Sequence, residues 1–414
     1  MTHPLRPVVV VVDKLVPGGQ GLCRDTDGVF FVDAVAAGDH IEVVVDRKRR
    51  GVRAGRLIRV VQPSADRADV DCALVSVCGG CDWLHLSRAA QTRCKQEIVV
   101  DALVRVGRFN ALDAAAFLRP LLTPSPAEAG GRRRARFIVD AAGRLAFFGR
   151  GSHVPTAIPT CAALEPRLSK TLSTLPRLRP SSVVRLALDD DGVVAGIDDD
   201  DAILLLAPHV RGVLSANGAR VGDPWLRGEI TAGFLPARSD ALTFAQATRF
   251  GGAAIRDLVL QGVGDVDGAD VLELFAGAGH LSLPLAKAGA RVDAVEGDVR
   301  ALEHLRENAS AFQLAVSPRR AFIDEGLSFG SVDVVVVDPP RTGIPGALGL
   351  FRRLRGGRRL VLVSCDPATG ARDLRAAVDA GFVVDSVTPV DAFPRTHHVE
   401  WVAVLTSGTV QGTI

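Results

Sequence analysis

The chain contains no tyrosine and a single methionine among its 414 residues, and we have no physical account of the missing tyrosine. It also has no apolar run near the roughly 20 residues that a helix needs to cross a bilayer, which excludes a helical membrane protein. The first residues, MTHPLRPVVVVVDK, lack the basic, apolar and cleavage regions of a signal peptide. We therefore expect a cytoplasmic protein with no membrane partner.

A large excess of one charge is also missing. The formal net charge is only +2, so no global field indicates a nucleic-acid partner. The distribution is more informative, because arginines cluster in segments 47–59, 132–136 and 352–359, whereas acidic residues gather between Asp189 and Asp201. A charge run usually forms a solvated face, but three separate arginine clusters favour a polyanion as a partner.

The length favours two or three domains, and their patterns differ. Residues 1–63 alternate short β-branched runs with tight turns, which predicts a small five-stranded β-barrel. Residues 87–108 have the apolar spacing of a helix capped at Ser87, which we expect to pack on the C-terminal domain. Residues 64–86 and 109–240 predict an α+β middle domain. From 241 to 414, strands alternate with helices, which predicts a parallel, doubly wound sheet.

A glycine-rich turn in VLELFAGAGHLSLPLA follows the first strand of that sheet. Gly277 and Gly279 allow the backbone to approach a ligand at the start of a helix. The third glycine of a dinucleotide fingerprint is absent, which argues against NAD. Glu296 ends the next strand, 19 residues after Gly277, where a carboxylate binds a ribose diol. The pattern favours an adenosine-type cofactor.

Cys365 ends another predicted strand, in LVLVSCDPATGARDL. Alone, a cysteine at this position is most simply a buried packing residue. Asp338, however, follows the strand VVVV in the motif Asp-Pro-Pro, which is typical of methyltransferases that use S-adenosylmethionine. Glu400 lies beside the last strand, after two histidines. Because the strands end at one edge of the sheet, we expect these three side chains to face the same cleft.

A thiol and a carboxylate near a methyl donor predict a particular reaction. Carbon 5 of a pyrimidine is a poor nucleophile, but a thiolate that adds to carbon 6 converts the ring into an enolate that attacks a methyl group. A base must then remove the proton from carbon 5 so that the thiol can leave. Methylation at nitrogen, which Asp-Pro-Pro alone would allow, needs no such cysteine.

Four other cysteines form a separate pattern. Cys72, Cys78 and Cys81 lie together in DCALVSVCGGC, and Cys161 follows 80 residues after Cys81. In a cytoplasmic protein, such thiols are ligands or nucleophiles rather than disulfides. Four thiolates fit a tetrahedral zinc or an iron–sulfur cluster. The spacing is unlike the paired C-x2-C of zinc ribbons, so we expect a cluster, with zinc as the alternative.

Together these motifs resemble the RNA 5-methyluridine methyltransferases, class I enzymes that methylate carbon 5 of uridine in rRNA or tRNA. The matching segments are LTFAQ, LELFAGAG, DPPRTG, VSCDPATGARDL and DAFPRTHHVE. The cysteine segment resembles the 4Fe-4S site of that family, and the first sixty residues resemble its RNA-binding TRAM barrel. The resemblance is weakest between residues 170 and 235.

The resemblance implies a Rossmann-like class I methyltransferase domain and roles for individual residues. It makes Cys365 the nucleophile and Glu400 the base at carbon 5, with Asp338 facing the uracil. S-adenosylmethionine would bind Gln246, Phe275, Gly277, His280, Glu296, Asp324 and Asp338. The 4Fe-4S cluster would bind Cys72, Cys78, Cys81 and Cys161.

The chain departs from this family at four positions. Asp366, Thr248 and His280 replace the usual asparagine, and Trp83 stands where glutamine is common. We expect the charge of Asp366, next to the nucleophile, to disfavour the thiolate. His280, at the cofactor loop, would change how the methionine end of the cofactor is held.

The leading expectation is therefore a monomeric RNA uridine-C5 methyltransferase. We favour 23S rRNA over tRNA, because a TRAM-like barrel and several basic patches suit a large structured RNA. A tRNA enzyme is one alternative. An RNA-binding protein of the same fold with lost or altered activity is the other.

Overall fold

The structure is a computed structural model that describes residues 6–49, 52–125 and 131–408. Its contacts divide the chain into two compact units. The smaller unit comprises residues up to Val99 together with Phe148–Val154 and Phe393–His398, and the larger unit comprises the rest. The domain boundaries expected at 63, 86, 108 and 240 stay predictions. Arg50, in the first arginine cluster, lies outside the described residues. No helix in the described ranges has the length and apolar character needed to cross a membrane.

Five strands of the smaller unit form a closed barrel in the order β1-β2-β3-β5-β4, which confirms the predicted N-terminal barrel. They are β1 (Val8–Leu15), β2 (Gly21–Asp25), β3 (Gly28–Val32), β4 (His40–Arg49) and β5 (Val52–Gln62). Alternate strand side chains fill its interior, including Val12, Cys23, Phe30, Ile41 and Val43, and Val35 from the β3–β4 connection packs with them. A glycine is required at position 55, because a Cβ atom there would meet the Val32 side chain at 2.8 Å.

Two helices follow the cysteine-rich segment, α1 (Arg88–Arg105) and α2 (Ala111–Phe117). Ser87 caps α1 as predicted, because its hydroxyl accepts a hydrogen bond from the Ala90 N–H at 3.2 Å. The division between the two units falls within α1, after Val99. The packing of this helix on the C-terminal domain therefore stays a prediction.

The middle of the chain forms a mixed seven-stranded sheet in the order β12-β11-β10-β9-β6-β7-β8. Its strands are β6 (Arg134–Val139), β7 (Leu145–Phe148), β8 (Pro155–Ala157), β9 (Val183–Leu188), β10 (Val193–Ile197), β11 (Gly212–Ser215) and β12 (Arg220–Gly222). Around it lie α3 (Pro166–Leu172), α4 (Ile203–Leu206), a ribbon of β13 (Leu226–Arg227) and β14 (Arg238–Ser239), and the 3-10 turns η2 (Asp200–Ala202), η3 (Ala207–His209) and η4 (Glu229–Thr231).

The acidic run after β9 is only partly solvated, because Asp189 and Asp199 are buried whereas its other aspartates are exposed. Asp189 is only 1% exposed and accepts two hydrogen bonds from the Arg211 guanidinium, at 2.9 and 3.0 Å. Its carboxylate also accepts from the N–H groups of Asp191 and Gly192, both at 3.0 Å. Asp190 pairs with Arg249 at 2.9 Å. These acids therefore fix a turn of the middle region by charge-assisted hydrogen bonds.

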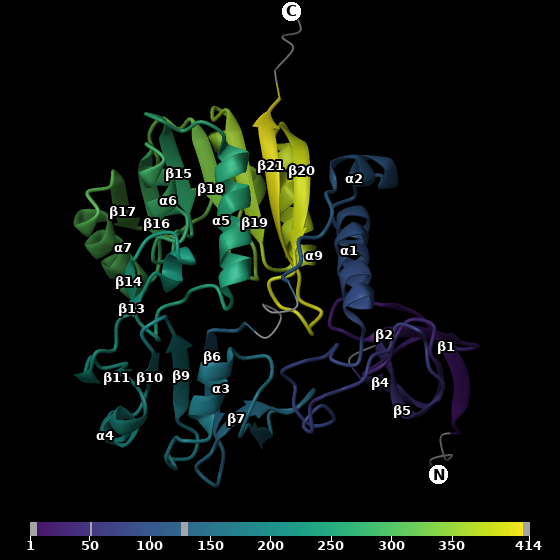
Figure 1. The fold of residues 1–414 in the computed structure, drawn as a ribbon. Helices are drawn as coiled ribbons and strands as arrows, with labels where there is room; N and C mark the ends of the chain where they lie inside the picture. The colour runs from purple at the N-terminus through teal and green to yellow at the C-terminus, as the bar shows by residue number, and fades with distance from the viewer. Residues whose placement is uncertain (1–5, 50–51, 126–130, 409–414) are drawn as a thin grey trace, which may run out of the picture. The chain divides into compact units, whose positions relative to one another are not determined.

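The C-terminal part forms a second seven-stranded sheet in the order β17-β16-β15-β18-β19-β21-β20 (Figure 1). Its strands are β15 (Asp270–Leu274), β16 (Arg291–Glu296), β17 (Val316–Arg320), β18 (Val334–Val337), β19 (Arg359–Ser364), β20 (Phe382–Val390) and β21 (Glu400–Ser407). The first five strands pair in parallel, and β21 runs antiparallel to β19 and β20. This topology confirms the predicted Rossmann-like domain.

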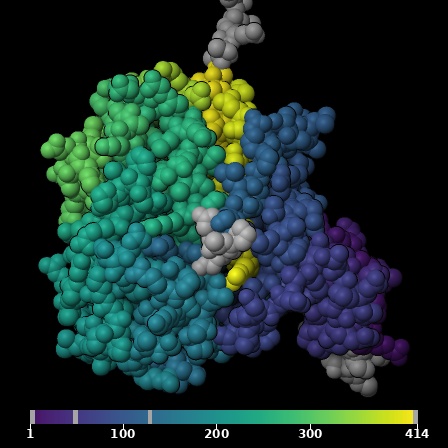
Figure 2. All heavy atoms as spheres, viewed as in Figure 1, coloured from purple at the N-terminus to yellow at the C-terminus, as the bar shows by residue number. Residues whose placement is uncertain are grey.

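Helices α5 (Arg249–Val263), α6 (Ser282–Lys287), α7 (Val299–Ala311), α8 (Ala347–Leu354) and α9 (Pro367–Asp379) cover this sheet. In Figure 1, α5 lies in front of the strands, and the space-filling view in Figure 2 shows the same face of the molecule covered by atoms. The central strands β15, β18 and β19 are almost entirely buried, which explains their runs of valine and leucine. The sheet order reverses between β15 and β18, so ligands are expected at the carboxyl ends of these strands.

Candidate active site

The register of the sheet aligns the strand ends where its order reverses. Leu274 pairs with Val295 on one side and with Val337 on the other. The N–H of Asp338 continues the ladder by donating to the Leu274 carbonyl at 3.2 Å. Glu296 and Asp338 therefore stand at one level on either side of β15. Both acids therefore lie at the carboxyl ends of strands next to β15, and their roles toward a ligand stay predictions.

The same edge continues through β19 and β21. Ser364 pairs with Trp401 in antiparallel register, so Cys365 and Glu400 come next to each other at the ends of their strands. Helix α9 approaches this edge closely, because a Cβ atom at Gly370 would lie 2.3 Å from the Ser364 hydroxyl. A larger residue at position 370 would therefore displace the side chains of Ser364 and Trp401, next to Cys365 and Glu400.

The glycine-rich turn after β15 has the conformation of a ligand cradle. Phe275 has a φ of +63°, an uncommon value for a bulky residue, and Gly277 has +56°. A Cβ atom at Gly277 would meet nothing within 4 Å, so the backbone there faces open space. The Glu296 carboxylate accepts from the N–H groups of Gly277 (2.8 Å), Gly297 (2.7 Å) and Asp298 (2.8 Å). These bonds hold the carboxylate beside the turn.

Burial raises the pKa values of the two carboxyl groups Asp338 and Glu400, at the carboxyl-end edge of the sheet. Glu400 is 4% exposed, and its Oε2 atom has no hydrogen-bond partner within the described part of the chain. Burial, together with the charge of Asp338, raises the pKa of Glu400 to about 8. Burial also raises the pKa of Asp338 to about 7. Both carboxyl groups can therefore gain or lose a proton near neutral pH.

The thiol of Cys365 is strongly affected by the same acids. Burial, followed by the charges of Glu400 and Asp338, raises its pKa from 9.0 to about 11. Cys365 is therefore a neutral thiol at pH 7 in the ligand-free protein. It becomes a strong nucleophile only when a neighbouring base takes its proton.

Two residues of this site were not singled out by the sequence analysis. Glu273 is 1% exposed inside β15 and accepts a hydrogen bond from the Ser282 hydroxyl. Burial, with the charges of Asp338 and Glu296, raises its pKa to about 8. The sequence feature that could have revealed Glu273 is a single acidic residue within the apolar strand VLELF. Exposed Arg341, in DPPRTG, acts in the opposite direction, because its charge lowers the pKa values of Cys365 and Glu400.

Asp366, which was expected to place a charge against the nucleophile, caps the following helix instead. Its carboxylate accepts from the N–H groups of Ala368 (3.0 Å) and Thr369 (2.9 Å) at the start of α9, and Pro367 occupies the first helical position. The partial positive charge of the helix terminus compensates the carboxylate. The acids that raise the pKa of Cys365 are Glu400 and Asp338.

We expect Asp366→Ala to lower the free energy of unfolding by about 1 kcal/mol, because the helix loses its cap, whereas Asp366→Asn stays within about 0.5 kcal/mol. Urea denaturation of the two variants and the wild type measures this difference. If asparagine costs as much as alanine, the charge rather than the hydrogen bonds of Asp366 matters.

Two further departures from the family lie near the turn. Burial lowers the pKa of His280 to about 4, so its ring is neutral at pH 7. Its Nδ1–H donates to the Ile230 carbonyl at 2.8 Å, while Nε2 is buried and has no hydrogen-bond partner among the residues that the structure describes. A Cβ atom at Gly252 would lie 3.5 Å from His280 and 3.3 Å from Gln246, so both side chains border the same glycine. Thr248 caps α5, where its hydroxyl accepts from the Gly251 N–H at 3.0 Å.

Asp324, predicted on the adenine side, lies in the connection between β17 and β18. Its carboxylate accepts from the Gly326 N–H at 2.8 Å, which makes it a turn residue. The contact to a cofactor stays a prediction.

The four cysteines of the predicted cluster are half-buried, and none forms a disulfide. The Cys78 sulfur accepts a hydrogen bond from the Gly80 N–H at 3.3 Å. Cys72, Cys78 and Cys81 belong to the smaller unit, whereas Cys161 belongs to the larger one. In the described ranges, no three histidine, cysteine, aspartate or glutamate side chains converge as a ready metal site. The donor chemistry fits a metal cluster, but a preformed ligand set is not seen.

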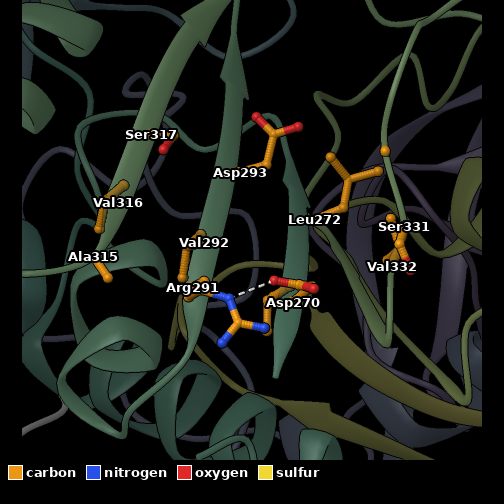
Figure 3. Close-up of a pocket in the computed structure, with 12 residues that line it drawn as sticks. Asp270, Leu272, Arg291, Val292, Asp293, Ala315, Val316, Ser317, Ser331 and Val332 are labelled. Atoms are coloured by element: carbon orange, nitrogen blue, oxygen red, sulfur yellow. Dashed lines mark hydrogen bonds and ion pairs between the residues drawn. The ribbon is translucent and has the colours of Figure 1, made fainter. Parts of the chain in front are cut away.

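A pocket of about 370 Å³ lies elsewhere on the sheet (Figure 3). Its lining residues begin β15, β16 and β17 and precede β18, and Arg291 donates to Asp270 across it at 2.7 Å. It is therefore at the amino ends of the strands and contains none of the predicted site residues. Because parallel sheets place their sites at the carboxyl ends, we do not assign this pocket to catalysis.

The chain is similar to proteins of known activity. A family model described as tRNA (uracil-5-)-methyltransferase matches residues 253–407. The 23S rRNA (uracil(1939)-C(5))-methyltransferase RlmD of Halomonas elongata is 33% identical, over 96% of this chain and 89% of that protein. The RlmD protein of Acidithiobacillus ferrooxidans is 29% identical, over 97% of this chain and 98% of that protein.

Among solved structures, the tRNA (uracil-54, C5)-methyltransferase of Pyrococcus abyssi, in complex with S-adenosyl-L-homocysteine, has the same fold. The TM-score is 0.74 at 22% identity, and the match covers 96% of this chain and 99% of that one.

Proposed function

Because the chain belongs to the RNA (uracil-5-)-methyltransferase family, we propose that it methylates carbon 5 of a uridine in 23S rRNA through a covalent adduct with Cys365. The observation that supports the mechanism is the strand register, which brings position 365 next to position 400 and pairs β19 with β18, the strand before Asp338. The rRNA substrate rests on the names of the RlmD relatives.

The residues of the cofactor turn fit S-adenosylmethionine. The open backbone at Gly277 leaves room for the cofactor, and the anchored carboxylate of Glu296 can accept hydrogen bonds from its ribose diol. The buried Nε2 of His280 can accept a hydrogen bond from its ammonium group. Phe275, Gln246, Asp324 and Asp338 complete the proposed pocket. When bound, the cofactor supplies an electrophilic methyl group on a sulfonium ion. Carboxylates around the pocket favour this cation over the uncharged sulfur of the product.

The chain's own groups then account for the proton movements. A carboxylate beside Cys365 takes the thiol proton as sulfur bonds to carbon 6 of the uracil, and Asp338 faces the ring. After carbon 5 has gained its methyl group, Oε2 of Glu400 takes the proton from carbon 5. The electron pair of that C–H bond re-forms the C5–C6 double bond, and Cys365 leaves carbon 6 with the electrons of the C–S bond.

The RNA target is tested with labelled S-adenosylmethionine and RNA from a strain that lacks this gene. We expect 5-methyluridine in 23S rRNA, found by nucleoside mass spectrometry and mapped by primer extension. Methylation of tRNA alone would make the chain a tRNA enzyme, and methylation of neither RNA would favour the RNA-binding alternative. We also propose that the enzyme acts in the cytoplasm as a monomer, which light scattering coupled to gel filtration tests.

We further propose that Cys72, Cys78, Cys81 and Cys161 hold a 4Fe-4S cluster, with zinc as the alternative. Support comes from their thiol chemistry, from the absence of disulfides and from the N–H donated to the Cys78 sulfur. No step of methyl transfer depends on the cluster.

Protein purified without oxygen is expected to be brown and to contain iron and acid-labile sulfide. The visible absorbance should disappear in Cys78→Ser and persist in Cys94→Ser, because Cys94 is a buried residue of α1. A colourless preparation with stoichiometric zinc would contradict the cluster and support the alternative.

A further inference from the structure

The segment Phe393–His398, which connects β20 to β21, is anchored within the smaller unit by its backbone. The Arg395 carbonyl accepts from the Trp83 N–H at 2.9 Å, and the Arg395 N–H donates to Gln91 at 2.8 Å. Lys95, which is fully buried, donates to the Phe393 carbonyl at 2.8 Å. Arg395 has a φ of +70°, a conformation that an arginine keeps only when its surroundings fix it.

Asp82 makes the anchor at the other end of this segment. Its Oδ2 atom accepts from the His397 backbone N–H at 2.9 Å and also from the His397 imidazole Nδ1–H. Both side chains are about four-fifths buried. The Trp83 ring meets the His397 ring edge-on, with centroids 6.5 Å apart, and its indole N–H donates to the Gly19 carbonyl at 3.0 Å. A single carboxylate oxygen thus holds both the main chain and the side chain of His397.

The anchored segment leads directly to the proposed base. Ala392, before the segment, belongs to the larger unit, where its carbonyl accepts from the Thr248 hydroxyl at 3.3 Å. After the segment, Val399 is fully buried and Glu400 opens β21. His397 and Glu400 are three residues apart, at most about 11 Å of extended chain. A displacement of His397 must therefore be absorbed within two residues or passed to Glu400.

We propose that Asp82 and His397 are positioning residues for Glu400. By fixing the segment Phe393–His398, they set the place of the carboxylate that removes the proton from carbon 5. Asp82 directly follows Cys81, so the placement of this base also depends on the conformation of the cysteine-rich segment. The inference rests on the proposed covalent mechanism and deepens it.

The proposal separates two parts of the reaction. Cys365 directly follows β19 and precedes the cap of α9, so addition to carbon 6 does not require the anchored segment. Glu400 pairs with Val390 of β20, but it is the first residue of β21 and comes two residues after the anchored segment. Only the last step requires Glu400 in place. Loosening the anchor should therefore leave attack and methyl transfer largely intact and slow the release of the methylated RNA.

The test is a single-turnover reaction with methyl-labelled cofactor and substrate RNA, resolved on a denaturing gel that separates free RNA from the RNA–protein adduct. For Asp82→Ala we expect product release to slow by about 10- to 100-fold. The labelled adduct should accumulate, with unchanged KM for both substrates. His397→Ala keeps the backbone N–H to Asp82 and should show a smaller effect. Asp82→Asn keeps an acceptor for that N–H and should recover part of the rate.

Asp66→Ala is the matched control, because Asp66 is an acid of the same unit whose salt bridge is to Arg93 rather than to a residue of this segment. If Asp82→Ala and His397→Ala behave like the control, or if adduct and product decrease together, the positioning role is wrong. Glu400→Gln serves as a reference. If Glu400→Gln accumulates no adduct, the proposed covalent mechanism is wrong. If Glu400→Gln accumulates adduct but Asp82→Ala and His397→Ala do not, the mechanism stands and only the positioning role is wrong.

Discussion

Cys365→Ala is expected to lower the rate of 5-methyluridine formation by at least about 10⁴-fold while leaving the affinity for S-adenosylmethionine within about twofold of the wild type. Without the sulfur atom, carbon 5 of uracil is not activated, and no other group at this edge can replace a thiolate. The cofactor turn is built on β15 and β16 and has no hydrogen bond to Cys365 that would be lost. Methyl incorporation measures the first quantity and isothermal titration calorimetry the second.

Cys94→Ala is the control for this prediction. It also removes a buried thiol with a raised pKa, here caused by burial and by the charge of Glu97, but it lies in α1. We expect nearly wild-type methylation from it. Wild-type rates from Cys365→Ala would contradict covalent catalysis and favour direct methylation, for example at nitrogen. Loss of cofactor binding together with activity would show that Cys365 supports the pocket instead.

The site residues on strands could be predicted because a parallel sheet converts sequence order into position. Asp338, Cys365 and Glu296 were each found at the end of an apolar strand, and the carboxyl ends of such strands share one edge. The barrel was predictable for a related reason, since its turns are marked by glycine and its strands alternate. In both regions the local sequence pattern of each strand is strong enough to determine which strands it pairs with.

The rest of the site depends on contacts that no local pattern contains. The polarity of Glu273 is visible in the sequence, but its raised pKa arises from burial between neighbouring strands and from the charges of Asp338 and Glu296, against the hydrogen bond from Ser282. The carboxylate of Asp366 was expected to face the thiol, and only the start of α9 explains why it points elsewhere. Likewise, the link between Asp82 and His397 joins residues 315 positions apart. Long-range packing, rather than motif chemistry, decides such features.

The acidic surroundings of Cys365 have a consequence for pH. Asp338 and Glu400 have pKa values raised to about 7 and about 8, so both are partly protonated in the neutral range. A general base works only in its ionised form. The rate of product release should therefore rise as the pH increases through about 8 and then become constant.

In Glu400→Gln, the rise of the product-release rate with pH should disappear. We expect the release of methylated RNA to fall by at least about 10³-fold, because a neutral amide cannot take the proton from carbon 5. Addition of Cys365 and transfer of the methyl group still occur. Labelled RNA should therefore remain attached to the protein on a denaturing gel, and the double variant Cys365→Ala/Glu400→Gln should show no such band.

The same substitution tests the cause of the raised pKa by an independent measurement. Burial, aided by Asp338, raises the pKa of Glu400 from 4.5 to about 8, so the folded chain binds this proton more tightly than the unfolded chain. The associated stability is present at pH 4 and is lost as the pH rises through about 8, by up to about 5 kcal/mol. Urea denaturation at pH 5 and pH 9 should show a smaller loss for Glu400→Gln than for the wild type. Equal losses would mean that Glu400 is not desolvated, and its assignment as the base would lose its physical support.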